Sequence, residues 1–208
     1  DFGIPDNKFI FCSFSNSYKI LPDTLQLWIN ILNDVDGSIL WLAETNKIAK
    51  ENILNYFFVQ GINPNRIVFA NRKKYIEDHL ARYNFVDLFL DTFPYNAHTT
   101  ACDALYLGVP VLTMYGDTFT SRVGLSLLKN LDVEELITTN TKEYQDKAIF
   151  LAKNPEILNG IKQKIIDNVK VKPLFNSKLS TRNLEKIYIK MHSKFYKGEK
   201  LESFDINN

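Results

Sequence analysis

Short apolar runs rich in β-branched and aromatic residues alternate along this chain with longer stretches whose apolar residues recur at helical spacing. This alternation restricts the fold more than any other feature, because it is the pattern of a mostly parallel sheet flanked by helices. Most of the runs are nearly continuously apolar, as in strands that are covered on both faces. The sequence therefore predicts an α/β fold with strands at residues 8–13, 38–43, 66–69, 86–90, 109–114 and 135–138.

The helices carry signals of their own. An amphipathic helix is expected to start at Pro22 and to stop at Asp36-Gly37, with apolar residues at i, i+3, i+4 and i+7 on one face. Asn140 and Glu143 resemble a capping box, and Asn154 places a cap residue before a first-turn proline. We therefore expect successive helices at 141–153 and 155–170, and a final amphipathic helix at about 181–195 that packs on this domain or on another.

Composition excludes several classes of protein. With 208 residues, 45% hydrophobic and 24% charged, the chain is long enough for one large domain with a real core. We find no repeat and no internal linker, and expect a lobe at residues 1–175 followed by a helical extension and polar tail at 176–208. A net charge of +1 argues against nucleic acid or an anionic membrane as main partner.

The chain has no apolar run of the ~18–20 residues that a membrane span needs, and its first residues are too polar for a signal peptide. Cys12 and Cys102 lie among apolar neighbours and form no CxxC or Cys/His cluster, so no disulfide framework and no zinc site are expected. A reducing compartment, the cytoplasm, fits this cysteine usage best.

Familiar catalytic motifs are absent from the sequence. The eight glycines never form GxGxxG or GxxxxGK[ST], which argues against a dinucleotide dehydrogenase and a P-loop NTPase. There is no GxSxG nucleophile elbow, and the three histidines lack HExxH spacing. We therefore assign no metal and no hydrolytic nucleophile.

Residues 90–105 read as the end of a strand, a turn and the start of a helix. In an open α/β sheet, ligands bind outside the carboxyl ends of strands, where a helix N-terminus presents free N–H groups to an anion. Thr99 and Thr100 add hydroxyls that suit a phosphate, and Asp103 is placed to accept hydrogen bonds from a ribose. A purely structural alternative is equally compatible, with His98 or Thr99 as a helix cap and Asp103 as a first-turn charge.

Two further polar groups follow strands. Lys19 ends a Ser/Asn-rich turn after the first strand, from which it can reach a pyrophosphate or simply remain in solvent, as most lysines do. His79 follows Lys73 and Lys74 on a short helix after the third strand. A single histidine is more often structural or exposed than functional, although an imidazole can stack on a base.

Taken together, these residues resemble the O-GlcNAc transferase and SPINDLY-type glycosyltransferases, especially bacterial members. The block Pro94-Tyr95-Asn96-Ala97-His98-Thr99-Thr100 with Asp103 is specific to that family, and the similarity continues in order along nearly the whole chain. The other matching segments are Phe11-Cys12-Ser13-Phe14, Tyr18-Lys19-Ile20, Ile39-Leu40-Trp41-Leu42, Asn65-Arg66-Ile67-Val68-Phe69, Gly108-Val109-Pro110-Val111, Ser121-Arg122-Val123 and Pro173-Leu174-Phe175-Asn176.

The resemblance implies the C-terminal, Rossmann-like lobe of a GT-B glycosyltransferase, which holds a UDP-sugar across a cleft from a second lobe. It implies an inverting, metal-independent enzyme that needs no cofactor besides its donor and transfers GlcNAc to Ser or Thr of proteins. Lys19 and His98 would stabilise the UDP leaving group as catalytic residues. By position, the donor-binding residues would be Asn16, Lys19, His79, His98, Thr99, Thr100 and Asp103, with His79 near the uracil and Asp103 on the ribose.

Two positions depart from the family pattern. Ile76 stands three residues before His79, where GlcNAc-using relatives often have a lysine, and Tyr95 occupies a place near the sugar's 2-substituent where some relatives carry a small residue. Another hexose or fucose, an N-linked or non-protein acceptor, and a non-catalytic nucleotide-binding module therefore stay open. The family's N-terminal lobe and TPR repeats have no counterpart here, so we expect a fragment that binds the donor without transferring sugar.

Overall fold

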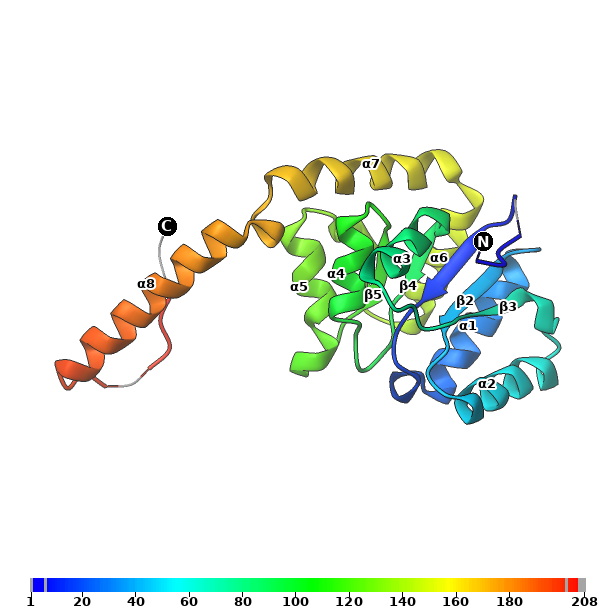
Figure 1. Ribbon diagram of the computed structural model, residues 1–208, viewed down its shortest axis with the longest axis horizontal. Helices are drawn as coiled ribbons and strands as arrows, with labels where there is room; N and C mark the ends of the chain where they lie inside the picture. Colours follow the sequence, from blue (N-terminus) through cyan, green and yellow to red (C-terminus); the bar gives the residue numbers. More distant parts are fainter. Residues whose placement is uncertain (1, 6, 201, 206–208) are drawn as a thin grey trace.

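The computed structural model describes residues 2–5, 7–200 and 202–205 and contains a six-stranded parallel sheet flanked by helices (Figure 1). The α/β prediction is confirmed. Each expected strand is present but begins one or two residues later, because a loop or a 3-10 turn occupies its start. The strands are β1 (Ile10–Ser13), β2 (Ile39–Ala43), β3 (Ile67–Ala70), β4 (Leu88–Leu90), β5 (Val111–Met114) and β6 (Ile137–Thr138).

The strand order is β3-β2-β1-β4-β5-β6. After β3 the chain crosses back over β1 and the sheet then grows in the opposite direction, so the switch point lies between β1 and β4. The carboxyl ends of these two strands diverge there and leave room for a ligand. Every residue of β1, β4 and β5 is buried, as expected for strands with helices on both faces.

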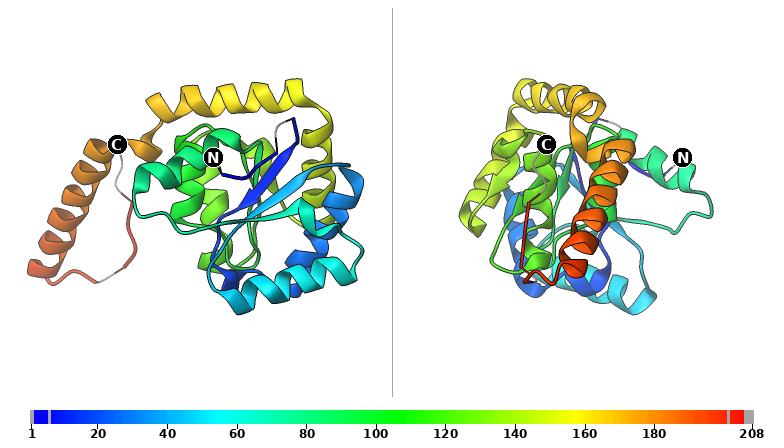
Figure 2. Two further views of the ribbon diagram at one scale, coloured as in Figure 1. Left: turned by 45° about the vertical axis from the view of Figure 1, so that its right-hand side comes forward. Right: turned by 90° about the vertical axis from the view of Figure 1, so that its left-hand side faces the viewer.

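Right-handed crossovers put the helices that follow β1 and β2 on one face and those that follow β4 and β5 on the other (Figure 2). α1 packs against α6 on the first face, and α7 crosses the domain to contact both α4 and α6. The helices are α1 (Pro22–Asp34), α2 (Lys47–Val59), α3 (Ile76–Leu80), α4 (Thr99–Tyr106), α5 (Val123–Asn130), α6 (Thr141–Lys153), α7 (Pro155–Val171) and α8 (Ser177–Tyr196).

Capping explains where the later helices begin. The Asn140 side chain accepts a hydrogen bond from the Glu143 N–H at 2.9 Å, while Glu143 accepts from the Thr139 N–H at 2.8 Å, so the expected box closes one residue earlier. Asn154 occupies the expected N-cap position before Pro155, but its side chain makes no cap bond, since its Nδ2 donates backwards to the Phe150 carbonyl. The helix α7 therefore begins at Pro155 without a side-chain cap.

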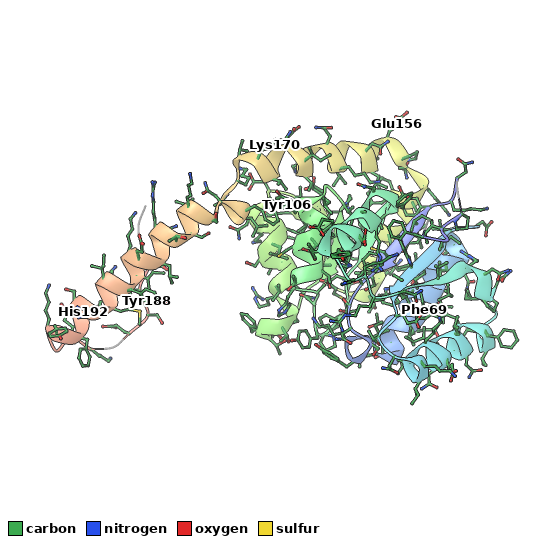
Figure 3. The ribbon with its side chains drawn as sticks, viewed as in Figure 1. Phe69, Tyr106, Glu156, Lys170, Tyr188 and His192 are labelled. Carbon is green, nitrogen blue, oxygen red and sulfur yellow. The ribbon has the colours of Figure 1, made fainter. Side chains whose placement is uncertain are left out.

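The last helix starts four residues before its expected position. The Asn176 side chain accepts from the Leu179 N–H at 3.0 Å and so caps the helix at Ser177. α8 projects away from the domain, and Tyr188 and His192 lie on the projecting part (Figure 3). It has no buried residue, so of the two alternatives left open by the sequence, packing on this domain is not the one observed. Within the described ranges, no helix has the length and apolar character of a bilayer span.

Candidate functional site

The two turns singled out in the sequence meet at the switch point. The 3-10 turn η1 (Ser17–Lys19) follows β1 and presents Lys19 to the loop that follows β4. The Lys19 Nζ donates to the Asn96 carbonyl at 2.8 Å and lies 3.9 Å from the Tyr95 ring centroid. Lys19 is therefore not a solvated loop lysine: it is half-buried, and burial lowers its pKa while Asp91 opposes the shift.

A buried carboxylate holds the loop after β4. Asp91 Oδ1 accepts from the Thr92 N–H at 2.8 Å and the Ala97 N–H at 2.6 Å, and Oδ2 accepts from the Thr113 hydroxyl at 2.6 Å. Burial raises the pKa of Asp91 to about 7, against these three hydrogen bonds and the Lys19 charge, all of which favour the ionised form. Asp91 thereby fixes the path of the backbone up to the start of α4.

Asn96 ties the same loop to the neighbouring elements. Its Nδ2 donates to the carbonyls of Thr92 at 2.9 Å and Met114 at 3.3 Å, and its Oδ1 accepts from the Gly124 N–H. The side chain is fully buried, so all three bonds are shielded from water. The Asn96 carbonyl is left to accept from Lys19, which sets the position of the ammonium group.

The start of α4 is open to a ligand. His98 occupies the N-cap position but makes no side-chain cap bond, and the Thr99 and Thr100 hydroxyls bond to no described residue. The simple capping alternative for the His98 side chain therefore fails. Burial and then the Lys19 charge lower the pKa of His98, which keeps its imidazole neutral at pH 7. First-turn N–H groups, two hydroxyls and Lys19 are together an arrangement that can bind an anion, here called the anion site.

His79 is held between a cation and a carboxylate. Its Nδ1 lies 3.3 Å from Arg82 Nη1 and its Nε2 lies 3.8 Å from Asp103 Oδ2. Because a guanidinium only donates, Nδ1 accepts, and the tautomer assigned from these partners carries its proton on Nε2, facing Asp103. Burial and Arg82 lower the pKa of His79, and burial raises the pKa of Asp103.

A hollow of about 510 Å³ opens beside His79 at the carboxyl ends of β1 to β3. Asn16, His79 and Arg82 line it, and the segment at residues 72–76, here called the outer loop, forms one of its walls. Ile76 lies in that wall together with Lys73 and Lys74, so the departure noted in the sequence falls within the hollow. The other predicted residues lie outside it: Lys19, Tyr95 and His98 form a cluster at the loop after β4, and Thr99, Thr100 and Asp103 lie on α4.

Tyr95 is central to a row of rings that borders the anion site. The ring centroids of Tyr18 and Tyr95 are 6.1 Å apart, those of Tyr95 and His98 are 5.4 Å apart, and those of His98 and Phe119 are 6.3 Å apart. Phe119 is 80% exposed at the end of this row. The aromatic row flanks the space into which a group attached to the bound anion would extend.

Sequence reasoning missed three residues that organise the site: Asp91, Asn96 and Arg82. Asp91 had a signal, since a carboxylate directly after a buried strand needs donors that only the fold can supply. Arg82 had one as well, because it lies three residues after His79, the spacing of neighbours on a helix. Elsewhere, the hollow of about 900 Å³ between the end of α8 and residues 202–204 contains none of the site residues.

Comparison with known proteins shows similarity along most of the chain. The family model for glycosyl transferase family 41 matches residues 1–184. A UDP-N-acetylglucosamine–peptide N-acetylglucosaminyltransferase of Caenorhabditis elegans is 34% identical over 99% of this chain and 18% of its own length. The probable SPINDLY transferase of Solanum lycopersicum is 34% identical over 93% of this chain and 21% of its own length. The chain thus spans about a fifth of these curated relatives.

The solved structures agree with the fold. A mutant of the Thermobaculum terrenum O-GlcNAc transferase superposes with a TM-score of 0.83 at 28% identity, covering 89% of this chain and 36% of that one. WaaG, a glycosyltransferase involved in lipopolysaccharide biosynthesis, superposes with a TM-score of 0.63 at 10% identity, which is evidence for the shared GT-B fold alone. The family match over most of the chain settles the classification: the chain belongs to glycosyl transferase family 41.

Proposed function

We propose that this chain is the donor-binding lobe of an inverting, metal-independent glycosyltransferase that moves GlcNAc from UDP-GlcNAc to Ser or Thr hydroxyls of proteins. The observation that carries the proposal is the hydrogen bond from Lys19 to the Asn96 carbonyl, which holds a cation beside the open start of α4. The relatives from C. elegans and T. terrenum support it, because their names describe transfer of N-acetylglucosamine to peptide and O-GlcNAc transfer.

The donor would lie across the site with its base in the hollow beside His79 and its sugar at the aromatic row. Its diphosphate would lie between Lys19 and the first turn of α4, where Thr99 and Thr100 donate from their hydroxyls. Its uracil would enter the hollow beside His79 and Asn16, and its ribose hydroxyls would donate to the Asp103 carboxylate. This direction leaves the sugar at the aromatic row, against Tyr95.

The reaction would be a displacement at the anomeric carbon. The acceptor hydroxyl oxygen forms the new bond while the bond from the anomeric carbon to the phosphate oxygen breaks, and its electron pair leaves with UDP. The acceptor proton passes to a base outside this lobe. Lys19, the α4 N–H groups and a hydrogen bond from neutral His98 would stabilise the charge that grows on the leaving diphosphate. In this reaction the fixed protein groups, rather than a metal ion, would stabilise the negative charge.

The identity of the transferred sugar depends on the space beside Tyr95. Tyr95 packs on both Lys19 and His98, so its ring narrows the space for a 2-acetamido group, and another hexose or fucose is the alternative that this ring favours. The protein acceptor would be bound by segments outside this chain, and the lobe alone would bind donor without turnover. A cytoplasmic location agrees with two free cysteines, Cys12 and Cys102.

The first test is calorimetric titration of this chain with UDP, UDP-GlcNAc, UDP-glucose and GDP-fucose. We expect binding of the UDP ligands, and loss of about tenfold or more in affinity in Lys19→Ala, because a charge-assisted phosphate contact contributes about 1.5–3 kcal/mol. Thr100→Ala should lose less, since it removes one neutral hydroxyl. Lys47→Ala, on an exposed part of α2, is the matched control and should bind as the parent does. Unchanged UDP affinity in Lys19→Ala would contradict the proposed site.

A further inference from the structure

Phe2 lies in the short arm before β1. Its ring packs on aromatic rings and also on side chains that line the hollow beside His79. Its ring centroid is 5.8 Å from that of Trp41 and 5.6 Å from that of Phe85. The same ring lies 6.0 Å from the Arg82 guanidinium carbon and 5.2 Å from Lys73 Nζ. A ring placed between two aromatic side chains and two cations has little freedom to move.

Arg82 is the group that links the Phe2 ring to His79. Its side chain is only 4% exposed, and its Nε is buried without a partner among the described residues. Its Nη2 donates to the Asn71 carbonyl, where the outer loop of the hollow begins, and its Nη1 reaches His79. A guanidinium with so little hydration depends on the groups packed around it, and the Phe2 ring supplies one of those contacts.

A second line of contacts joins Phe2 to the same histidine. The Trp41 ring meets the Phe14 ring at 5.3 Å, and the Phe14 ring meets the His79 imidazole at 6.1 Å. Trp41 is 1% exposed and Phe14 is 4% exposed, so this line of rings is part of the packed core. His79 is therefore supported by Phe2 from two sides, through a guanidinium and through a line of tilted and edge-to-face ring contacts.

We propose that Phe2 is a positioning residue of the nucleotide site: by packing on Trp41 and the Arg82 guanidinium, it holds His79 in the orientation that receives the base. The inference rests on the proposed function in one respect, that the hollow takes the base of the donor. It gives the arm before β1 a role in donor binding, although none of the arm's described residues lines the hollow.

Titrations with UDP and with inorganic pyrophosphate separate this role from general destabilisation. In Phe2→Ala we expect UDP affinity to fall about tenfold, the scale of a lost aromatic and cation–π contact, while pyrophosphate affinity stays at the parent value because Lys19 and α4 are untouched. Phe2→Tyr should restore UDP binding. Phe58→Ala removes an exposed ring from α2 and serves as the matched control. Equal losses for both ligands, or none for UDP, would overturn the proposal.

Titration of His79 in the ligand-free protein tests the role of Phe2 separately from the proposed function. If the parent does not bind UDP, the proposed function fails, but the imidazole ¹⁵N resonances of His79 still report on Phe2. We expect the pKa of His79 to rise toward its ordinary value in Phe2→Ala, because water reaches Arg82 and the guanidinium leaves Nδ1, while Asp103 still faces Nε2. Phe2→Leu replaces the alanine variant if that one unfolds. An unchanged His79 titration would overturn the positioning role.

Discussion

At the scale of single residues, the sequence indicated groups that would face the proposed ligand and missed the groups that hold the site in place. Lys19, Thr99 and Thr100 were singled out because polar residues after parallel strands gather at one edge of a sheet, whereas the role of His98 was implied by the family resemblance. Asp91 and Asn96 were missed because their function consists of partners from distant segments, such as Thr113 for Asp91. The sequence around a residue does not predict a hydrogen bond that forms only when two distant strands pair.

Asp91 gives a prediction for the dependence of stability on pH. Its pKa of about 7 in the folded chain exceeds the ordinary value of 3.8, so between these pH values the folded chain keeps a proton that the unfolded chain has released. The stabilisation from this proton is complete below pH 3.8 and is lost as the pH rises through 7. Asp91→Asn removes the titration while its amide can still meet the same three partners.

Urea unfolding of the parent and of Asp91→Asn at several pH values measures the effect. We expect the free energy of unfolding of the parent to fall relative to the variant as the pH rises from 4 to 7, by up to about 1.4 kcal/mol per pH unit. Groups common to both proteins cancel in this difference. A difference that stays constant across that range would show that Asp91 is ionised throughout and would contradict the raised pKa.

At the scale of elements, local signals located a helix well where capping and amphipathicity agreed. The bounds of α6 were predicted as observed because Asn140 caps it and its apolar positions face the core. The start of α8 was misplaced because the signal at Asn176 was missed, although an asparagine directly before a helical run is a cap pattern. The strand order could not be read from local patterns, since it depends on which strands pair.

The two asparagines before α6 and α7 form a matched pair for testing the capping account. Asn140→Ala should lower the free energy of unfolding by about 1 kcal/mol, because the Glu143 N–H loses its partner. Asn154→Ala should change it by less than about 0.5 kcal/mol, since that side chain does not cap the following helix. Denaturant unfolding measures both, and equal losses would contradict the distinction between the two sites.

At the scale of the whole molecule, the family resemblance predicted the GT-B lobe and its donor edge, whereas the placement of α8 followed from neither pattern nor family. A 20-residue helix usually gains its stability by burying an apolar face. Here that face, with Leu184, Tyr188, Met191 and Phe195, stays exposed. The helix contacts the domain mainly through η6 (Pro173–Phe175), which suits the proposed division into a lobe at 1–175 and an extension at 176–208.

Truncation after Asn176 tests that division. Because no residue of α8 is buried, we expect the shortened chain to retain its free energy of unfolding within about 1 kcal/mol and to bind UDP as the full chain does. It should also self-associate less, since a large exposed apolar face is removed. Truncation before Pro155 is the control and should unfold the domain, because α7 buries Leu158, Ile161 and Ile165 in the core. Denaturant unfolding and sedimentation measure these outcomes, and a loss of several kcal/mol on removing α8 alone would mean that the extension is part of the lobe.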